Sequence, residues 1–113
     1  MIGGVMKEIE LTIDFENTHT KDDLHNKMSE LFGFPDFYGR NFDALIDCLS
    51  SLRIPEDELT SINISQDECI LLRMAHVESL SAELAYDLFT VIQSVNQRGY
   101  YEDEKDTIRL VLC

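Results

Sequence analysis

Two aspartates four residues apart, Asp43 and Asp47, are the side chains of this chain with the clearest potential for chemistry. Residues at this spacing lie one turn apart on one face of a helix, so a helix here would aim both carboxylates the same way. Like charges so placed destabilise a helix by roughly 0.2–0.5 kcal/mol. No Lys or Arg stands at positions 39, 44, 50 or 51, and Arg40 is the basic residue nearby in sequence. The pair suits charge-assisted hydrogen bonds with basic groups of a partner.

The overall charge favours the same kind of partner. Nine Lys and Arg residues face 22 Asp and Glu residues, which gives a formal net charge of -13. A field of this sign repels nucleic acid and anionic membranes and attracts basic proteins. An acidic composition also serves solubility, so the charge alone decides little. Together with the aspartate pair, it predicts a basic protein partner and no direct nucleic-acid or membrane binding.

The residues around the aspartates predict a loop followed by a helix. Pro35 blocks continuation of a preceding helix, and Gly39 permits a turn. Asn41 can then cap a helix that runs to about residue 52. This helix positions the acidic pair, and the loop over residues 34–39 leads directly into it.

The predicted helix has an apolar and an acidic face. Its apolar stripe consists of Phe42, Leu45, Leu49 and Leu52. The two aspartates lie on the opposite side, Ile46 falls on the border, and the loop adds Phe37 and Tyr38. An acidic helix face is often no more than a solvated surface. Aromatic and apolar side chains beside charge are nevertheless typical of interfaces, so the pattern favours a protein-binding surface.

The rest of the chain alternates between strand and helix patterns. Apolar periodicity predicts three strands, at residues 8–15, 69–74 and 107–112. Helical spacing predicts two further helices, at about 21–32 and 80–98, with Gly33 and Gly99 as their terminators. Thr20 can cap the first of them, with Asp23 completing an approximate capping box. Residues 55–68 form a polar connection that begins with an acidic run, and residues 100–106 read as an acidic turn.

This order predicts an α/β fold. Strands separated by helices form right-handed crossovers and hence a parallel sheet. We expect a two-layer domain with a three-stranded parallel sheet in the order 1-2-3, helices packed against it and the polar first strand at an edge. Residues 8–113 form this single domain, and residues 1–7 are predicted to be a flexible N-terminal extension.

The cysteines and the hydropathy favour the cytosol. Cys48, Cys69 and Cys113 lie far apart in apolar runs, a pattern that suits reduced, buried thiols rather than a disulfide framework. The N-terminus has no hydrophobic signal stretch, and no apolar run approaches transmembrane length.

Catalytic and metal sites are not predicted. The sequence has no nucleophile motif or phosphate-binding loop, and paired carboxylates on an exposed helix ordinarily titrate normally. His19 and His25 are six residues apart across a strand–helix junction, and Asp22 and Asp23 between them suit a helix N-terminus better than a metal. His76 has no obvious partner among its sequence neighbours. We therefore expect neither an enzyme nor a cofactor.

The segment 35–49 resembles the core motif of the barstar family of intracellular ribonuclease inhibitors. Its sequence, PDFYGRNFDALIDCL, is similar to the family pattern P-x-Y-Y-G-x-N-x-D-A-L-W-D-C-L. The similarity includes both aspartates and the Tyr-Gly-x-Asn turn. The rest of the chain agrees with the family in the order and spacing of its elements. Barstar proteins have a three-stranded parallel sheet with helices packed against it.

The resemblance implies an inhibitor without catalysis of its own, acting as an immunity protein against a toxin. Asp47 matches the family aspartate that occupies the site of a substrate phosphate, and Asp43 matches a supporting acidic contact. The expected partner is a basic nuclease toxin of the ribonuclease type, bound 1:1 in the cytoplasm. The expected partner-binding residues are Phe37, Tyr38, Gly39, Arg40, Asn41, Asp43, Ile46, Asp47 and Ser94.

Three positions depart from the family pattern. Phe37 lacks the hydroxyl of the first motif tyrosine, and Ile46 replaces the motif tryptophan. Ser94 stands where the family has an acidic contact on the long later helix. The acidic pair is kept while its surroundings differ, so we expect a nuclease other than barnase. The alternative is a barstar-like adaptor that binds a basic non-nuclease partner without inhibition; an adjacent gene for a basic toxin would favour the inhibitor.

Overall fold

A computed structural model of the chain describes residues 6–103 and 106–113, together with the side chains of residues 6–99 and 106–113. Most of the predicted flexible extension, residues 1–5, lies outside the described residues. The elements are β1 (Lys7–Asp14), α1 (Lys21–Phe32), α2 (Phe42–Ser50), the 3-10 turn η1 (Pro55–Asp57), β2 (Glu68–Ala75), the 3-10 turn η2 (Val77–Ser79), α3 (Ala82–Asp103) and β3 (Ile108–Leu112).

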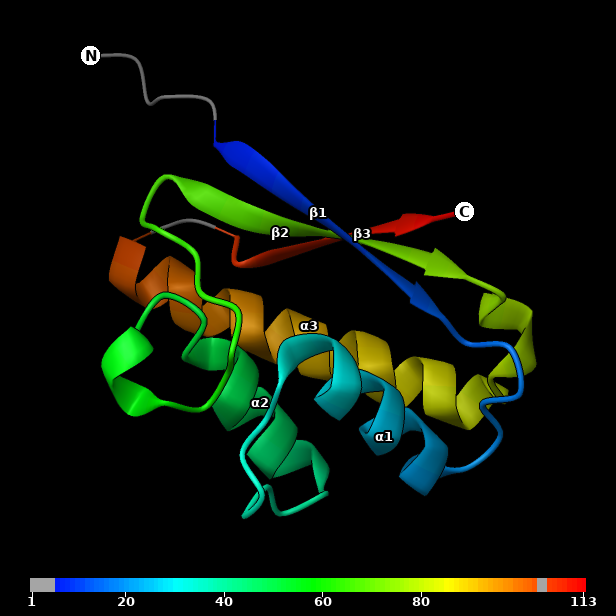
Figure 1. Cartoon of the computed structure of the whole chain (residues 1–113). Coiled ribbons are helices and arrows are strands. Elements are labelled where there is room, and N and C mark those ends of the chain that lie inside the picture. The colour runs from blue at the N-terminus through cyan, green and yellow to red at the C-terminus, as the bar shows by residue number, and fades with distance from the viewer. Residues whose placement is uncertain (1–5, 104–105) are drawn as a thin grey trace.

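The predicted α/β fold is confirmed. The three strands form one parallel sheet in the order β1-β2-β3, with β2 in the centre. All three α-helices lie on one side of this sheet, so the domain has two layers (Figure 1). The register pairs Lys7 with Glu68 and Ile70 with Ile108, so segments far apart in sequence meet across β2.

The ends of α1 follow from its local sequence. Thr20 and Asp23 form the predicted capping box, in which the Thr20 hydroxyl accepts from the Asp23 amide and the Asp23 carboxylate accepts from the Thr20 amide. Gly33 ends the helix in the left-handed conformation, with φ of 66°. A methyl group at Gly33 would also overlap Ser61, whose hydroxyl donates to the Phe32 carbonyl. The sequence predicted both the N-terminal cap and the glycine that ends this helix.

The predicted end of α3 is wrong. The helix passes through Gly99 and continues to Asp103, so the expected turn over residues 100–106 is helical in its first part. Gly99 does not adopt a left-handed conformation and is buried. A mid-helix glycine costs about 1 kcal/mol relative to alanine, which packing can offset. Asn96 supplies part of that packing, because its side-chain oxygen accepts from the amides of Thr107 and Ile108.

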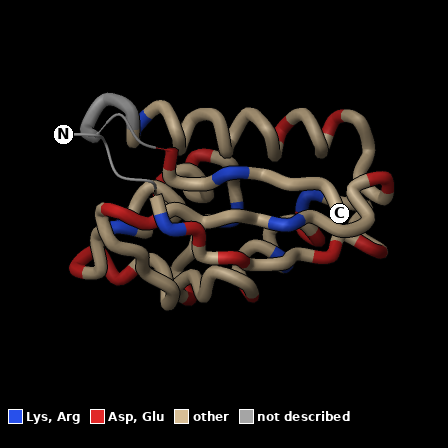
Figure 2. Tube along the Cα trace, turned by 90° about the horizontal axis from the view of Figure 1, so that it is seen from above, with Lys and Arg blue, Asp and Glu red and all other residues tan. Residues whose placement is uncertain are grey.

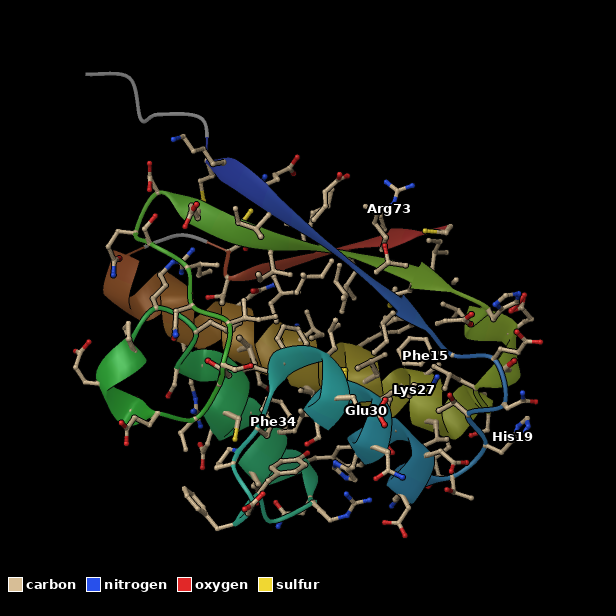
Figure 3. All side chains as sticks on the ribbon, in the orientation of Figure 1. Phe15, His19, Lys27, Glu30, Phe34 and Arg73 are labelled. Atoms are coloured by element: carbon tan, nitrogen blue, oxygen red, sulfur yellow. The ribbon has the colours of Figure 1, made fainter. Side chains whose placement is uncertain are left out.

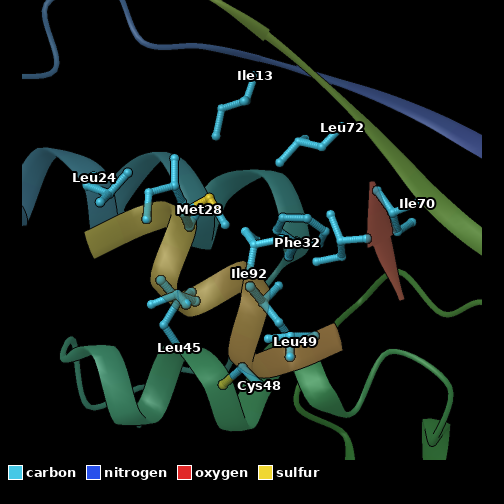
Figure 4. Close-up of a cluster of buried hydrophobic side chains, with 14 of the residues drawn as sticks. Ile13, Leu24, Met28, Phe32, Leu45, Cys48, Leu49, Ile70, Leu72 and Ile92 are labelled. Atoms are coloured by element: carbon cyan, nitrogen blue, oxygen red, sulfur yellow. The ribbon is translucent and has the colours of Figure 1, made fainter. Parts of the chain in front are cut away.

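The core fills the space between the sheet and the helices (Figure 4). Ile13, Ile70 and Leu72 face down from the sheet towards side chains of all three helices. The helices contribute the buried residues Leu24, Met28, Phe32, Leu45, Cys48, Leu49 and Ile92. The expected apolar stripe of the second helix therefore faces this core, although Phe42 is only half-buried and the helix ends at Ser50 rather than near residue 52.

The outer face of the sheet is polar on β1, as its alternation predicted. Glu8, Glu10, Thr12 and Asp14 are exposed there, while Ile13 is buried. Arg109 on β3 pairs with Glu8, and Arg73 on β2 pairs with Glu10 at 3.6 Å. Arg73 points away from the helices (Figure 3). In the plan view, acidic positions occur on many sides of the trace, whereas several of the fewer basic positions lie on the strands (Figure 2).

The cysteines differ in one respect from expectation. Cys48 and Cys69 are buried free thiols, as predicted, and burial raises the pKa of both. Cys113 is exposed, so its predicted burial is wrong. It follows the last residue of β3, at the end of an edge strand of the sheet. The described residues include no helix long and apolar enough to cross a membrane.

Candidate functional site

The acidic pair lies on the solvent-facing side of α2. The Asn41 side chain accepts from the Ala44 amide at 2.8 Å and so fixes the first turn of this helix. Leu45 and Leu49 are fully buried on the opposite side. Asp43 and Asp47 are exposed, and the Asp47 side chain retains 63% of its free surface. Helix periodicity thus predicted the direction of both carboxylates, and a rigid core holds them outward.

Asp47 has a partner that the sequence reading missed. Nη1 of Arg98, on α3, donates to Oδ1 of Asp47 at 3.0 Å and to the Ser50 hydroxyl at 3.3 Å. The two partners are 51 residues apart in the chain, so spacing within α2 could not reveal the contact. Arg98 lies three residues after the buried Val95, which places it on the flank of α3 beside α2. The sequence signal for this contact was the position of Arg98 next to the apolar stripe of α3.

The loop before α2 presents one aromatic ring and buries another. Phe37 is 78% exposed, the most exposed large hydrophobic side chain among the described residues. Tyr38 is only 9% exposed, and its hydroxyl lies 2.5 Å from Nδ1 of the buried His25 on α1. Its ring also packs on Phe34, at 4.7 Å between centroids. Tyr38 therefore anchors the loop to the core, and Phe37 is the side chain offered to solvent.

The buried pair of His25 and Tyr38 is held in its neutral form. Burial lowers the pKa of His25, and the nearby Arg40 charge lowers it further. Burial likewise raises the pKa of the Tyr38 phenol well above its ordinary value. Two neutral groups sharing one short hydrogen bond form a stable support for the loop.

The turn into α2 is made by Arg40 rather than by Gly39. Arg40 has φ of 53°, whereas Gly39 does not adopt a left-handed conformation. Arg40 donates to the main-chain carbonyl of Asp22 at 3.2 Å and to its carboxylate at 3.3 Å. This contact fixes the exposed loop to the first turn of α1. Gly39 lies close to Asn41 and Ala44, so it has little space for a side chain.

The remaining predicted residues are Ile46 on α2 and Ser94 on α3. Ile46 is half-buried and packs against the core at the edge of the acidic face. Ser94 is half-buried on α3, and its hydroxyl donates back to the Thr90 carbonyl at 3.0 Å. It stands one helical turn before Arg98. The structure thus gathers Asp43, Ile46 and Asp47 on α2, with Ser94 and Arg98 on the adjoining helix.

A cleft of about 570 Å³ opens beside Asp47, between the end of α2, the segment 51–66 and α3. Arg53 organises its inner wall. Its guanidinium donates to three carbonyls and one hydroxyl, those of Ser65, Glu68, Asp106 and Thr107. Asp57 accepts from the Ser51 hydroxyl at 2.7 Å on the opposite wall. The segment 51–66, which the sequence left without a role, therefore shapes one side of the acidic face.

The residues considered for a metal are not brought together. Asp23 is committed to the capping box, and His25 to Tyr38. Asp14, Glu16 and His76 are the three potential ligands that do converge among the described residues. Nδ1 of His76 lies 2.8 Å from Oδ1 of Asp14, a partner distant in sequence. All three are exposed and the ion pair accounts for their proximity, so they give no reason to assign a metal.

Comparisons with known proteins agree with this geometry. The family model described as "Barstar (barnase inhibitor)" matches residues 9–113. A curated relative, "Putative ribonuclease inhibitor YrdF" of Bacillus subtilis (strain 168), is 51% identical over 37 residues. That match covers 33% of this chain and 37% of the relative, so it spans well under half of either protein.

Proposed function

Because the chain belongs to the barstar family, we propose that it is a cytoplasmic inhibitor, an immunity protein, that blocks the active site of a basic ribonuclease toxin in a 1:1 complex. The observation that carries the proposal is the exposure of Asp43 and Asp47 on a helix whose opposite side buries Leu45 and Leu49 completely. A fixed pair of carboxylates can enter an active site without the entropic cost of ordering a flexible segment.

The inhibition is electrostatic mimicry. A ribonuclease holds the phosphates of its substrate with basic side chains, and a carboxylate in the same place makes charge-assisted hydrogen bonds with them. By the family resemblance, Asp47 takes the phosphate position and Asp43 supports it. Exclusion of water from the complex strengthens these interactions, and a carboxylate offers no phosphodiester bond for the toxin to cleave.

The neighbours of the pair provide the apolar part of the interface. Phe37 stands exposed at the loop and Ile46 borders the acidic face, so both can bury apolar surface around the central charges. Tyr38 and Arg40 contribute indirectly, because their contacts with α1 hold the loop in place. Since Phe37 and Ile46 replace a tyrosine and a tryptophan of the family pattern, the partner is a nuclease other than barnase.

The test is to co-purify the tagged chain with the product of the neighbouring gene and to assay nuclease activity. The wild-type chain should abolish that activity at equimolar concentration. Asp47→Ala should weaken binding by about 2 kcal/mol or more, as is usual for a charged hot spot. Measurements on barstar and barnase are among those that define this magnitude. If Asp43→Ala and Asp47→Ala both inhibit like the wild type, the site assignment is wrong.

Glu10→Ala is a matched control. Glu10 is also an exposed carboxylate paired with an arginine, and its side chain is 61% exposed against 63% for Asp47. It lies on the exposed face of β1, opposite to the face that carries the buried Ile13. The substitution removes the same charge from the molecule, so it measures the loss of net charge alone.

A further inference from the structure

Arg98 is a positively charged side chain beside the acidic face, whose carboxylates Asp43 and Asp47 would bind the basic groups of a partner. Its guanidinium is half exposed and pairs with Asp47 and Ser50. Among the described residues Asp43 forms no ion pair, so Arg98 is the charge that faces this acidic surface from α3. A nuclease that approaches Asp47 with basic groups therefore also approaches Arg98.

The position of Arg98 is fixed even though its side chain is long. Val95 and Gly99 on either side of it are buried, so the backbone of α3 cannot withdraw from α2. The cleft behind Arg98 already contains the guanidinium of Arg53, which is bound to oxygens of four residues. Turning Arg98 into this cleft would bring two like charges together, and the Asp57 carboxylate in the cleft wall already accepts a hydrogen bond from the Ser51 hydroxyl.

The same electrostatics constrain the partner. Asp47 exchanges its bond with Arg98 for bonds with the basic groups of the active site. Among the described residues Asp47 is the carboxylate that pairs with Arg98, so Arg98 would then be desolvated beside those basic groups without this counter-charge, which is unfavourable. A carboxylate of the nuclease placed against Arg98 removes this cost and adds a charge-assisted hydrogen bond.

We infer that Arg98 is a specificity-determining residue of the binding surface and that the cognate nuclease places an Asp or Glu carboxylate against its guanidinium. The surface is thus two-signed: Asp43 and Asp47 recognise basic groups, and Arg98 recognises an acidic one. The inference rests on the proposed function. It explains how an inhibitor of this family would reject nucleases whose active-site rim is basic throughout.

The experiment measures the association and dissociation rates of the co-purified nuclease with Arg98→Ala and Arg98→Glu. Removing one member of a buried charge pair typically costs at least 2 kcal/mol, so Arg98→Ala should weaken binding by roughly 30-fold or more, mainly through faster dissociation. Arg98→Glu should weaken it further. Unchanged or tighter binding of Arg98→Ala would overturn the inference, because Arg98 would then only compete with the nuclease for Asp47.

Arg73→Ala and Arg73→Glu are the controls. Arg73 also pairs with a carboxylate and is 44% exposed against 51% for Arg98, but it lies on the far face of the sheet. These variants change the net charge equally and should leave the dissociation rate unchanged. Thermal melts of all four variants distinguish a folding defect from an interface effect.

A double-mutant cycle then identifies the acidic group. Each Asp and Glu on the nuclease is substituted by Ala and combined with Arg98→Ala; one of them should lose its effect in the combination. Absence of coupling at every such position would refute the inference. Loss of binding in Asp47→Ala with wild-type behaviour of Arg98→Ala would refute it alone, whereas a wild-type chain that inhibits no nuclease would overturn the proposed function as well.

Discussion

The hydroxyl of Tyr38 and Nδ1 of His25 lie 2.5 Å apart in the protein interior and join the loop over residues 34–39 to α1. Tyr38 thus has a structural role, whereas the neighbouring Phe37 is exposed.

Tyr38→Phe should destabilise the protein by about 1–3 kcal/mol, because it leaves the buried His25 nitrogen without its partner while keeping the ring. The free energy of unfolding from urea titration measures this loss. Inhibition should weaken less than for Asp47→Ala, since the loop is loosened but no central charge is removed. A Tyr38→Phe variant as stable as the wild type would show that the hydrogen bond contributes nothing.

Acidification should destabilise the protein through His25. Burial holds its folded-state pKa below the unfolded value of 6.5, so the unfolded chain binds the proton first as the pH falls. The contribution of neutral His25 is therefore fully present above pH 6.5 and is lost progressively below it. Urea titrations between pH 8 and pH 5 should show this decrease, and His25→Gln, which cannot titrate, should reduce it.

His76 should act in the opposite direction. Its hydrogen bond to Asp14 raises its pKa above 6.5 in the folded protein, so its contribution is present below pH 6.5 and is lost as the pH rises through the folded value. His76→Asn removes this term and serves as the counterpart of His25→Gln. The free energy of unfolding of the wild type should fall relative to His25→Gln as the pH drops below 6.5. It should fall relative to His76→Asn as the pH rises above 6.5.

Asn41→Ala should lower stability by about 1 kcal/mol, the usual cost of losing an N-cap, because the Ala44 amide loses its acceptor. It should also weaken inhibition, since the frayed first turn carries Asp43. Ser81→Ala removes the equivalent cap of α3, at the opposite end of that helix from Ser94 and Arg98. If Ser81→Ala reduces inhibition as much as Asn41→Ala does, the effect is one of global stability rather than of site geometry.

Salt should slow association more than it speeds dissociation. A net charge of -13 attracts a basic nuclease over long distances, and ions screen this field beyond about 8 Å at physiological ionic strength. Stopped-flow measurements between low and high salt should show a steep fall of the association rate. A rate that does not change with salt would contradict electrostatic steering by the acidic surface.

The sequence predicted the parts of this fold that depend on local chemistry. The capping box at Thr20, the left-handed Gly33 and the cap at Asn41 are set by residues within a few positions of one another. The prediction that Gly99 ends α3 was wrong because the helical conformation of Gly99 depends on the packing of α3 against distant segments. The contact of Asn96 with Ile108 is an example. Local propensity cannot anticipate a tertiary contact of this kind.

The candidate site likewise combines features that the local sequence predicts with features that depend on tertiary contacts. Periodicity predicted the outward direction of Asp43 and Asp47, because the spacing of buried residues fixes the opposite face. It could not predict the inward turn of Tyr38, since a loop has no period that assigns side chains to faces. Arg98 was missed because helices packed side by side bring together residues whose separation in the chain carries no pattern.

The parallel sheet also has a consequence for biosynthesis. Lys7 pairs with Glu68 and Ile70 with Ile108, so the sheet joins segments that the ribosome releases at widely separated times. Arg53 likewise binds carbonyl oxygens at the start of β2 and just before β3. We therefore expect the acidic helix to reach its final support only after β3 has emerged. On the proposed function, a chain still being synthesised would not inhibit its nuclease, so a cell that makes both proteins at the same moment would need the nuclease to become active later than its inhibitor.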